Sequence, residues 1–446
     1  MAETAEMKRK FNVAIITAGG AGMFCGSCMQ DNALASALIQ QGHKVTLIPT
    51  YTPIRVDSED QTGSPVFLGG INVYLDHFSP LWRKMPHWVR SPLDRPGVIR
   101  FLTRFGISND AKQLGSMTVS LLKGKYGPHQ RAIEEFCDWV VQDVKPDVIL
   151  FSNLLLGGIA PSLREQFQGP VLSLLQGDDV FLDGLIEPWR AEVLELMNAN
   201  SQHFHGFISH SQFYLNYMRE YLKVTHGSSH CIPLGIELPK QEVDFADAPP
   251  LKSPNRLGID SPVTIGYFAR LAAEKGLDLL VQAVLLLKEE FPQLQLEAGG
   301  YLAPHQQAYW ESVQELAQPL GDRFRYLGSP ETSADKAALF RRWNLFSVPA
   351  RFVEPKGISI LEALSFGLPV VQPNSGAYPE LLESVESSVL VKPEDPQALA
   401  DGIRQLLTHD RSLLELGQQA RQVVQNRHSS HHTAAALVEH IHALTQ

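Results

Sequence analysis

The chain has 446 residues, of which 44% are hydrophobic and 19% are charged, and its formal net charge is −10 at pH 7. This length predicts two or three domains of an ordinary globular protein. The negative charge argues against a nucleic-acid partner, and no segment approaches the roughly 20 apolar residues that a membrane-spanning helix needs. The four cysteines are too few for a disulfide framework, so we expect a cytoplasmic protein.

The first part of the chain has the order strand, glycine-rich loop, helix and strand. We expect strands at 13–17 and 44–50, a helix at 31–41, and a loop that contains Gly19, Gly20 and Gly22. This order is typical of the start of a Rossmann-like domain. Because the loop lacks G-x-G-x-x-G spacing, a dinucleotide role is only weakly indicated.

Cys25 and Cys28 form a single C-x-x-C pattern just before the first helix. One such pair does not specify a zinc site, although thiols at the start of a helix can have a lowered pKa and redox activity. A structural or acceptor-loop role is favoured, and the redox and metal roles stay open.

Residues 77–104 interleave aromatic side chains with six arginines and lysines, and Asp94 is their only acid. On an acidic protein, such a stretch is suited to an anionic membrane surface or a phosphorylated acceptor. Four prolines exclude one continuous amphipathic helix. The alternative is an irregular surface segment whose long side chains cover apolar groups.

Polar residues follow the next strands. A helix is expected at 131–144, and strands are expected at 145–152, 171–176 and 204–211. Gln176 ends one strand and is followed by Asp178 and Asp179, and His210 lies near the end of the next. Asp178 or Asp179 either takes up a proton from an acceptor or caps the next helix. For His210, a structural role is favoured over a catalytic one.

The second half restarts the pattern after a Pro- and Asp-rich linker. A strand that contains Gly266 leads into a loop with Arg270 and Lys275. The further expected elements are a helix at 277–288, strands at 293–300, 324–328, 344–350 and 389–391, and a helical region at 395–446. The histidines near the end have no Cys or acid cluster beside them, so no metal site is predicted.

The stretch Arg351–Val371 is the most informative, and it is interpreted as loop, helix and buried strand. Glu354 precedes the helix, and Glu362 lies inside it. Between them, the amides of Gly357 and Ile358 are expected to be free, because the first N–H groups of a helix have no partner within it. This pattern predicts an anion site flanked by two hydroxyl-binding acids, as a sugar nucleotide requires. The alternative is an ordinary helix with two solvated acids.

Glu354 and Glu362 with seven residues between them, followed by Gly-Leu-Pro-Val-Val, resemble the signature of the family-4 retaining glycosyltransferases. The resemblance implies the GT-B fold, an α/β architecture of two Rossmann-like domains whose parallel sheets face a central cleft. We therefore expect an acceptor domain at 1–240, a linker at 241–260 and a donor domain at 261–429. A final helix at 430–446 is expected to cross back to the first domain.

The resemblance also implies roles for individual residues. Glu354, Arg270 and Lys275 would be catalytic, and the two cations would stabilise the negative charge of the departing diphosphate. Glu362 would bind the ribose. The other expected donor-binding residues are Gly357, Ile358, Gly266, Gly19 and Gly20, and the expected acceptor pocket contains Gln176, Asp178, Asp179 and His210. For the first glycine loop, a purely structural turn stays open.

Two positions depart from the pattern of this family. Gln176 stands where many such enzymes have a His near the anomeric centre, and a Gln side chain does not titrate and cannot act as a general base. Lys356 stands where an aromatic or small residue is commoner.

The expected function is transfer of a hexose from a nucleotide-sugar to a lipid, saccharide or small-molecule acceptor, with retention of the anomeric configuration. Family precedent implies front-face attack, in which the leaving phosphate accepts the proton of the acceptor. The two cations would make a metal or other cofactor unnecessary. Gln176 keeps open a catalytically silent sugar-nucleotide-binding protein, and a GT-B epimerase or hydrolase also remains an alternative.

Overall fold

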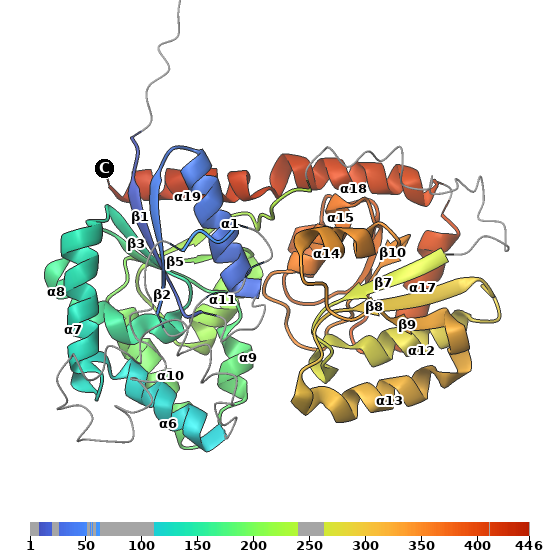
Figure 1. Cartoon of the computed structure of the whole chain (residues 1–446), viewed down its shortest axis with the longest axis horizontal. Helices are drawn as coiled ribbons and strands as arrows, with labels where there is room; N and C mark the ends of the chain where they lie inside the picture. Colours follow the sequence, from blue (N-terminus) through green and yellow to red (C-terminus); the bar gives the residue numbers. More distant parts are fainter. Residues whose placement is uncertain are drawn as a thin grey trace, which may run out of the picture. The chain divides into compact units, whose positions relative to one another are not determined.

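The computed structural model describes residues 9–19, 26–50, 54, 56, 59–62, 111–239, 263–409 and 411–445, those at 111–113 by their backbone only. The predictions for Gly20, Gly22, Cys25, residues 77–104 and the linker at 241–260 lie outside this part. The chain divides into two compact units, Met1–Ile232 with Thr433–Gln446 and Pro233–His432 (Figure 1). Within the described ranges, no helix combines the length and the apolar character that crossing a membrane requires.

The first unit is built on a six-stranded sheet with the order β2-β1-β3-β4-β5-β6, in which all neighbours are parallel. Its strands are β1 (Asn12–Thr17), β2 (Lys44–Pro49), β3 (Val148–Phe151), β4 (Val171–Leu174), β5 (Gly206–Ser209) and β6 (Ser228–Cys231). The order changes direction between β1 and β3. In open α/β sheets, ligands bind outside the carboxyl ends of the strands at such a switch point.

Alternate residues of β1 face opposite sides of this sheet, as the two-residue period of a strand requires. Val13 and Ile15 pack with α1 (Gly26–Gln40) and α19 (Ser430–Leu444), whereas Ala14 and Ile16 belong to the core on the other face. The helices of that other face are α6 (Ala111–Leu122), α7 (Gln130–Trp139), α8 (Ala160–Gln166), α9 (Asp178–Asp183), α10 (Trp189–Ser201) and α11 (Gln212–Tyr221).

The second unit has a six-stranded parallel sheet with the order β12-β11-β10-β7-β8-β9. Its strands are β7 (Val263–Phe268), β8 (Leu294–Gly299), β9 (Phe324–Tyr326), β10 (Leu345–Phe346), β11 (Val370–Pro373) and β12 (Ser388–Val391). Counted from β7, this is the Rossmann order, and its switch point lies between β7 and β10.

The core of the second unit contains large aromatic side chains between the sheet and its helices. The helices are α12 (Leu277–Leu287), α13 (Gln307–Ala317), α14 (Ser333–Phe340), α15 (Ile358–Ser365), α16 (Tyr378–Leu382), α17 (Pro396–Leu407) and α18 (Leu413–Arg427). Gly266 lies inside β7, where a Cβ atom would come within 2.1 Å of the ring of Trp343. The absence of a side chain at Gly266, which was expected to bind the donor, allows this close packing.

Two strands differ clearly from the sequence-based expectation. β10 is only Leu345–Phe346, shorter than the expected strand at 344–350. β6 was not expected, because its sequence Ser-Ser-His-Cys has no apolar alternation. It lies at the edge of the sheet, and its pairing with β5 forms the strand in spite of this polar sequence.

Candidate active site

The predicted donor residues follow two neighbouring strands of the second unit. β7 and β10 pair at the switch point, with Leu345 opposite Ile265. After β7, the chain forms a short 3₁₀ turn, Ala273–Lys275, before α12. After β10, the loop contains Glu354 and leads into α15. Because parallel strands end at the same edge, the sheet brings both loops to one place.

Lys275 and Glu354 form an ion pair at this edge. The Lys275 Nζ atom lies 3.0 Å from Glu354 Oε2, and the two side chains are 18% and 12% exposed. The same Nζ lies 4.3 Å from the ring centroid of Phe352, within the range of a cation–π contact. The ammonium is thus held on two sides by the loop that carries Glu354.

The carboxyl group of Glu354 is almost completely buried. Burial alone raises its pKa, but the charge and hydrogen bond of Lys275, with smaller contributions from the Gly357 amide and Lys356, lower the pKa overall. Glu354 is therefore an anion at neutral pH. It can accept hydrogen bonds from hydroxyl groups but has no proton to donate.

The amide of Gly357 is not free, contrary to the expectation for a helix N-terminus. Its N–H donates to Glu354 Oε1 at 3.4 Å, so the carboxylate itself occupies this position. Gly357 has φ +85°, and a Cβ atom there would lie 2.8 Å from Leu381. Among the described residues, the amide of Ile358 donates no hydrogen bond. Within the described residues, the unpaired donor of the predicted anion site is therefore the Ile358 amide.

Gly376 packs directly against the backbone of Glu354. It has φ +62°, and a Cβ atom there would lie 2.5 Å from the carbonyl oxygen of Glu354. The next amide, that of Ala377, donates to this oxygen at 2.8 Å. Only glycine permits so close an approach in this conformation.

Glu362 lies in α15 and has a partner that sequence reasoning missed. Lys336 of α14 lies 2.9 Å from Glu362 Oε1, and the two side chains are 16% and 18% exposed. Lys336 is the only basic residue of α14. The sequence contains no spacing that connects this lysine with a glutamate on a later helix.

Arg270, the second predicted cation, does not contact Glu354 in the structure. Its side chain is half exposed, and Nη2 lies 3.2 Å from Glu274 Oε1. The structure therefore brings together Lys275, Glu354 and Gly357, whereas Arg270 pairs within its own loop.

In the first unit, Gln176 is part of a buried polar cluster. Its Nε2 donates to the carbonyl oxygen of Ser152 at 2.6 Å and to Asp31 Oδ1 at 3.3 Å. Ser152 follows β3, Gln176 follows β4, and Asp31 lies near the start of α1. Sequence reasoning missed Asp31, which it interpreted only as the start of a helix. Gly19, with φ +89°, follows β1 at the same edge of the sheet.

His210 follows β5 and contacts Gln30 of α1 through Nε2. Its Nδ1 lies 3.3 Å from the carbonyl oxygen of Ile232. Because a carbonyl can only accept, Nδ1 carries the proton, and Nε2 accepts from the amide of Gln30. In this arrangement, no lone pair of the His210 ring is left to take up a proton from an acceptor.

Asp178 and Asp179 are buried in the first turn of α9, whose N-cap residue is Gly177. Asp178 accepts the amide of Leu154 at 3.2 Å, and Asp179 accepts the hydroxyl of Tyr214. Burial raises the pKa of Asp179, partly opposed by the Tyr214 hydrogen bond. The raised pKa favours the protonated form of Asp179.

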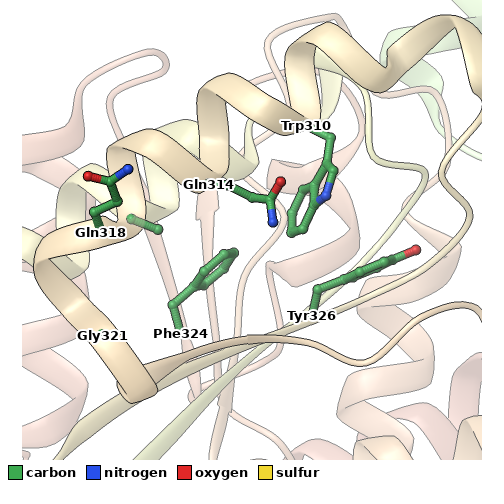
Figure 2. A pocket seen from close by; sticks show the side chains of 7 residues that line it. Trp310, Gln314, Gln318, Gly321, Phe324 and Tyr326 are labelled. Atoms are coloured by element: carbon green, nitrogen blue, oxygen red, sulfur yellow. The ribbon is translucent and has the colours of Figure 1, made fainter.

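A hollow of about 460 Å³ lies elsewhere in the second unit, between α13 and β9. Trp310 and Gln314 of α13 and Phe324 and Tyr326 of β9 line it (Figure 2). None of its lining residues is charged, so it is not suited to a diphosphate. In the described part of the chain, no group of three or more His, Cys, Asp or Glu side chains could hold a metal.

Residues 252–423 match the family model of glycosyl transferases group 1, which confirms the predicted resemblance. The D-inositol 3-phosphate glycosyltransferase of Corynebacterium efficiens is 32% identical over 167 residues, which are 36% of this chain and 38% of that protein. The chain thus matches well under two thirds of the length of this relative.

Two solved structures resemble the chain over almost its whole length. Sucrose-phosphate synthase from Thermosynechococcus elongatus has a TM-score of 0.65 at 20% identity, with 97% of this chain and 98% of that chain covered. HepE from Anabaena, in complex with UDP and glucose, has a TM-score of 0.62 at 17% identity, with 97% and 100% covered. These likenesses, with the two parallel sheets, confirm the predicted GT-B fold class.

Proposed function

We propose that this chain, whose residues 252–423 match the glycosyl transferases group 1 family, transfers a hexose from a nucleotide-sugar to an acceptor. The observation that carries the proposal is the Lys275–Glu354 ion pair at the switch point of the second unit, beside the N-terminus of α15. A buried carboxylate next to an ammonium and a helix N-terminus can bind a hydroxyl-rich sugar and a diphosphate side by side.

Lys275 binds the donor diphosphate in this proposal. An ammonium group has three donors, of which Glu354 takes one, so the others can reach phosphate oxygens. The amide of Ile358 adds a donor at the N-terminus of α15. Arg270, which is half exposed, can exchange Glu274 for a phosphate.

The two glutamates bind the two hydroxyl-bearing parts of the donor. Glu354, an anion, accepts hydrogen bonds from the transferred sugar. Glu362 accepts those of the ribose, and Lys336 fixes its orientation at 2.9 Å. HepE, the Anabaena protein with a similar fold, was solved in complex with UDP and glucose. This supports a nucleoside diphosphate as part of the donor.

Retention follows from front-face attack. The bond from the acceptor oxygen to the anomeric carbon forms while the bond from that carbon to the phosphate oxygen breaks, and the acceptor proton passes to the departing phosphate. Gln176 cannot take this proton because an amide does not titrate, so the mechanism does not rely on it. Lys275 and Arg270 stabilise the charge on the phosphate in place of a metal.

The acceptor binds in the first unit, at the polar carboxyl edge of the sheet around Gln176. Its class is a lipid, saccharide or small molecule with a free hydroxyl. The Corynebacterium efficiens relative acts, by its name, on an inositol phosphate, which supports a small polyhydroxyl acceptor. The basic stretch at 77–104 would bring the chain to an anionic membrane if the acceptor is a lipid.

Release of nucleoside diphosphate from UDP- and GDP-hexoses tests the proposal. We expect release that depends on added acceptor, with the α-linked product from an α-linked donor. Release without acceptor would indicate a hydrolase. Binding without turnover would indicate a catalytically silent binding protein. Glu354→Gln, measured beside the wild type, should retain the fold and lose release.

Replacement of Glu362 by alanine is expected to weaken donor binding by about 10- to 100-fold, since hydrogen bonds to a charged group contribute about 1.5–3 kcal/mol. Titration calorimetry with the nucleoside diphosphate measures this directly. Glu386→Ala is the matched control, because it removes an exposed glutamate paired with Arg411. Equal affinities of the two variants would contradict the ribose assignment of Glu362.

A further inference from the structure

Arg351 joins the two loops of the donor site. Its Nη1 donates to Asp278 Oδ1 at 2.9 Å, and its Nη2 donates to Asp278 Oδ2 at 2.5 Å. Nη1 also donates to the carbonyl oxygen of Ala273 at 2.5 Å. Arg351 lies in the loop after β10, whereas Ala273 and Asp278 flank Lys275 in the chain after β7. The Arg351 guanidinium therefore contacts both ends of the segment 273–278, which carries Lys275.

The backbones of the two loops also meet. The amide of Arg351 donates to the carbonyl oxygen of Glu274 at 2.9 Å. Gly276 has φ +70°, and a Cβ atom there would lie 2.1 Å from the carbonyl oxygen of Pro349. The position of Lys275 is thus determined by how the loop after β10 packs against its own loop.

Asp278 is held in place by a second donor. The hydroxyl of Tyr309 donates to Asp278 Oδ1 at 2.8 Å. Burial alone raises the pKa of Asp278, but the hydrogen bonds of Arg351 and Tyr309 lower it overall. Burial and the charge of Asp278 raise the pKa of Tyr309, so this hydroxyl stays a neutral donor. The Arg351–Asp278 pair is therefore charged at neutral pH.

We propose that Arg351 and Asp278 are positioning residues that set the Lys275–Glu354 ion pair, an inference that rests on the proposed function. Phe352 and Glu354, the two contacts of the Lys275 ammonium, follow Arg351 in the same loop. When the bidentate contact is lost, the two loops shift against each other and the ammonium leaves its place between them. A displacement of about 1 Å in a reacting group can cost 10²-fold in rate.

A buried acid in the same unit provides a matched control for the Arg351–Asp278 contact. Glu297 of β8 accepts two bonds from Arg342, at 3.1 and 2.6 Å, and one from the indole nitrogen of Trp343 at 3.1 Å. Asp278 likewise accepts two bonds from an arginine and one from an aromatic side chain. Asp278→Asn and Glu297→Gln therefore remove the same kind of charge, and within the described part of the chain Glu297 contacts neither Lys275 nor Glu354.

The test compares nucleotide-sugar transfer by the wild type, Asp278→Asn and Glu297→Gln across pH, together with their melting temperatures. We expect similar falls in melting temperature for both variants. The kcat/KM of Asp278→Asn should fall by about 10- to 100-fold, mostly in kcat, whereas that of Glu297→Gln should change less than about 2-fold. The acid limb of the pH profile should move upward only in Asp278→Asn.

The shift of the acid limb separates positioning from general stability. Lys275 is the largest influence that lowers the pKa of Glu354. Lys356, the other cation that lowers it, and Tyr378, a buried hydroxyl whose own pKa is raised by Glu354, are unchanged in the variant. Equal activity and equal pH profiles of the two variants would contradict the positioning role of Arg351 and Asp278. They would not contradict the proposed function. A wild type without nucleotide-sugar turnover would overturn both.

Discussion

Replacing Lys275 by glutamine is expected to lower kcat/KM by about 10²- to 10³-fold, the usual cost of removing one preorganised donor from a developing charge. Lys275 contacts Glu354 directly and is the more buried of the two predicted cations. Steady-state transfer assays with saturating acceptor measure the loss. Lys392→Gln is the control, since it removes an exposed lysine that pairs with Asp395 at 3.3 Å and should leave activity unchanged.

The same substitution should also destabilise the protein, because it leaves the buried carboxylate of Glu354 without its cation. Adding Glu354→Gln removes this uncompensated charge. We therefore expect the double variant to regain melting temperature but not activity. Recovery of transfer in the double variant would mean that the loss in Lys275→Gln came from misfolding rather than from the missing ammonium.

Replacing Gly376 by alanine is expected to abolish most of the activity by displacing Glu354. The new Cβ atom would meet both the carbonyl oxygen and the amide nitrogen of Glu354, at 2.5 and 2.7 Å. These are backbone atoms, so no side-chain rotation relieves the overlap. The left-handed backbone alone costs about 1–2 kcal/mol for a residue with a Cβ atom.

Gly328→Ala separates these two effects. Gly328 also has a positive φ, +76°, but a Cβ atom there would have nothing within 4 Å. Both variants should therefore lose stability in urea denaturation, and only Gly376→Ala should lose transfer activity per folded molecule. Equal retention of activity in both would show that the position of Glu354 tolerates this displacement.

Much of the fold follows from local patterns in the sequence. Apolar runs such as 13–17 and 263–268 are long enough to be buried parallel strands, and the helices between them predict crossovers. Because all strand ends of a parallel sheet lie at one edge, the loops with Lys275 and Glu354 could be expected to meet. β6 was not predicted from the sequence, because its pairing with β5, and not its polar sequence, makes it a strand.

The partners of the charged residues could not be predicted in the same way. Lys336 with Glu362 and Arg351 with Asp278 join segments that are far apart in sequence, and their meeting depends on loop conformation. The rule that a helix leaves its first amides unpaired also failed at one position. It ignores preceding side chains, and Glu354 reaches forward to accept the N–H of Gly357.

The measurement that tests the central claim most directly is a crystal structure with bound UDP or GDP. The account predicts phosphate oxygens within hydrogen-bond distance of Lys275 Nζ and of the Ile358 amide, with ribose hydroxyls on Glu362. A nucleotide bound elsewhere, for example against Trp310 and Tyr326, with the lysine and both glutamates untouched, would contradict it.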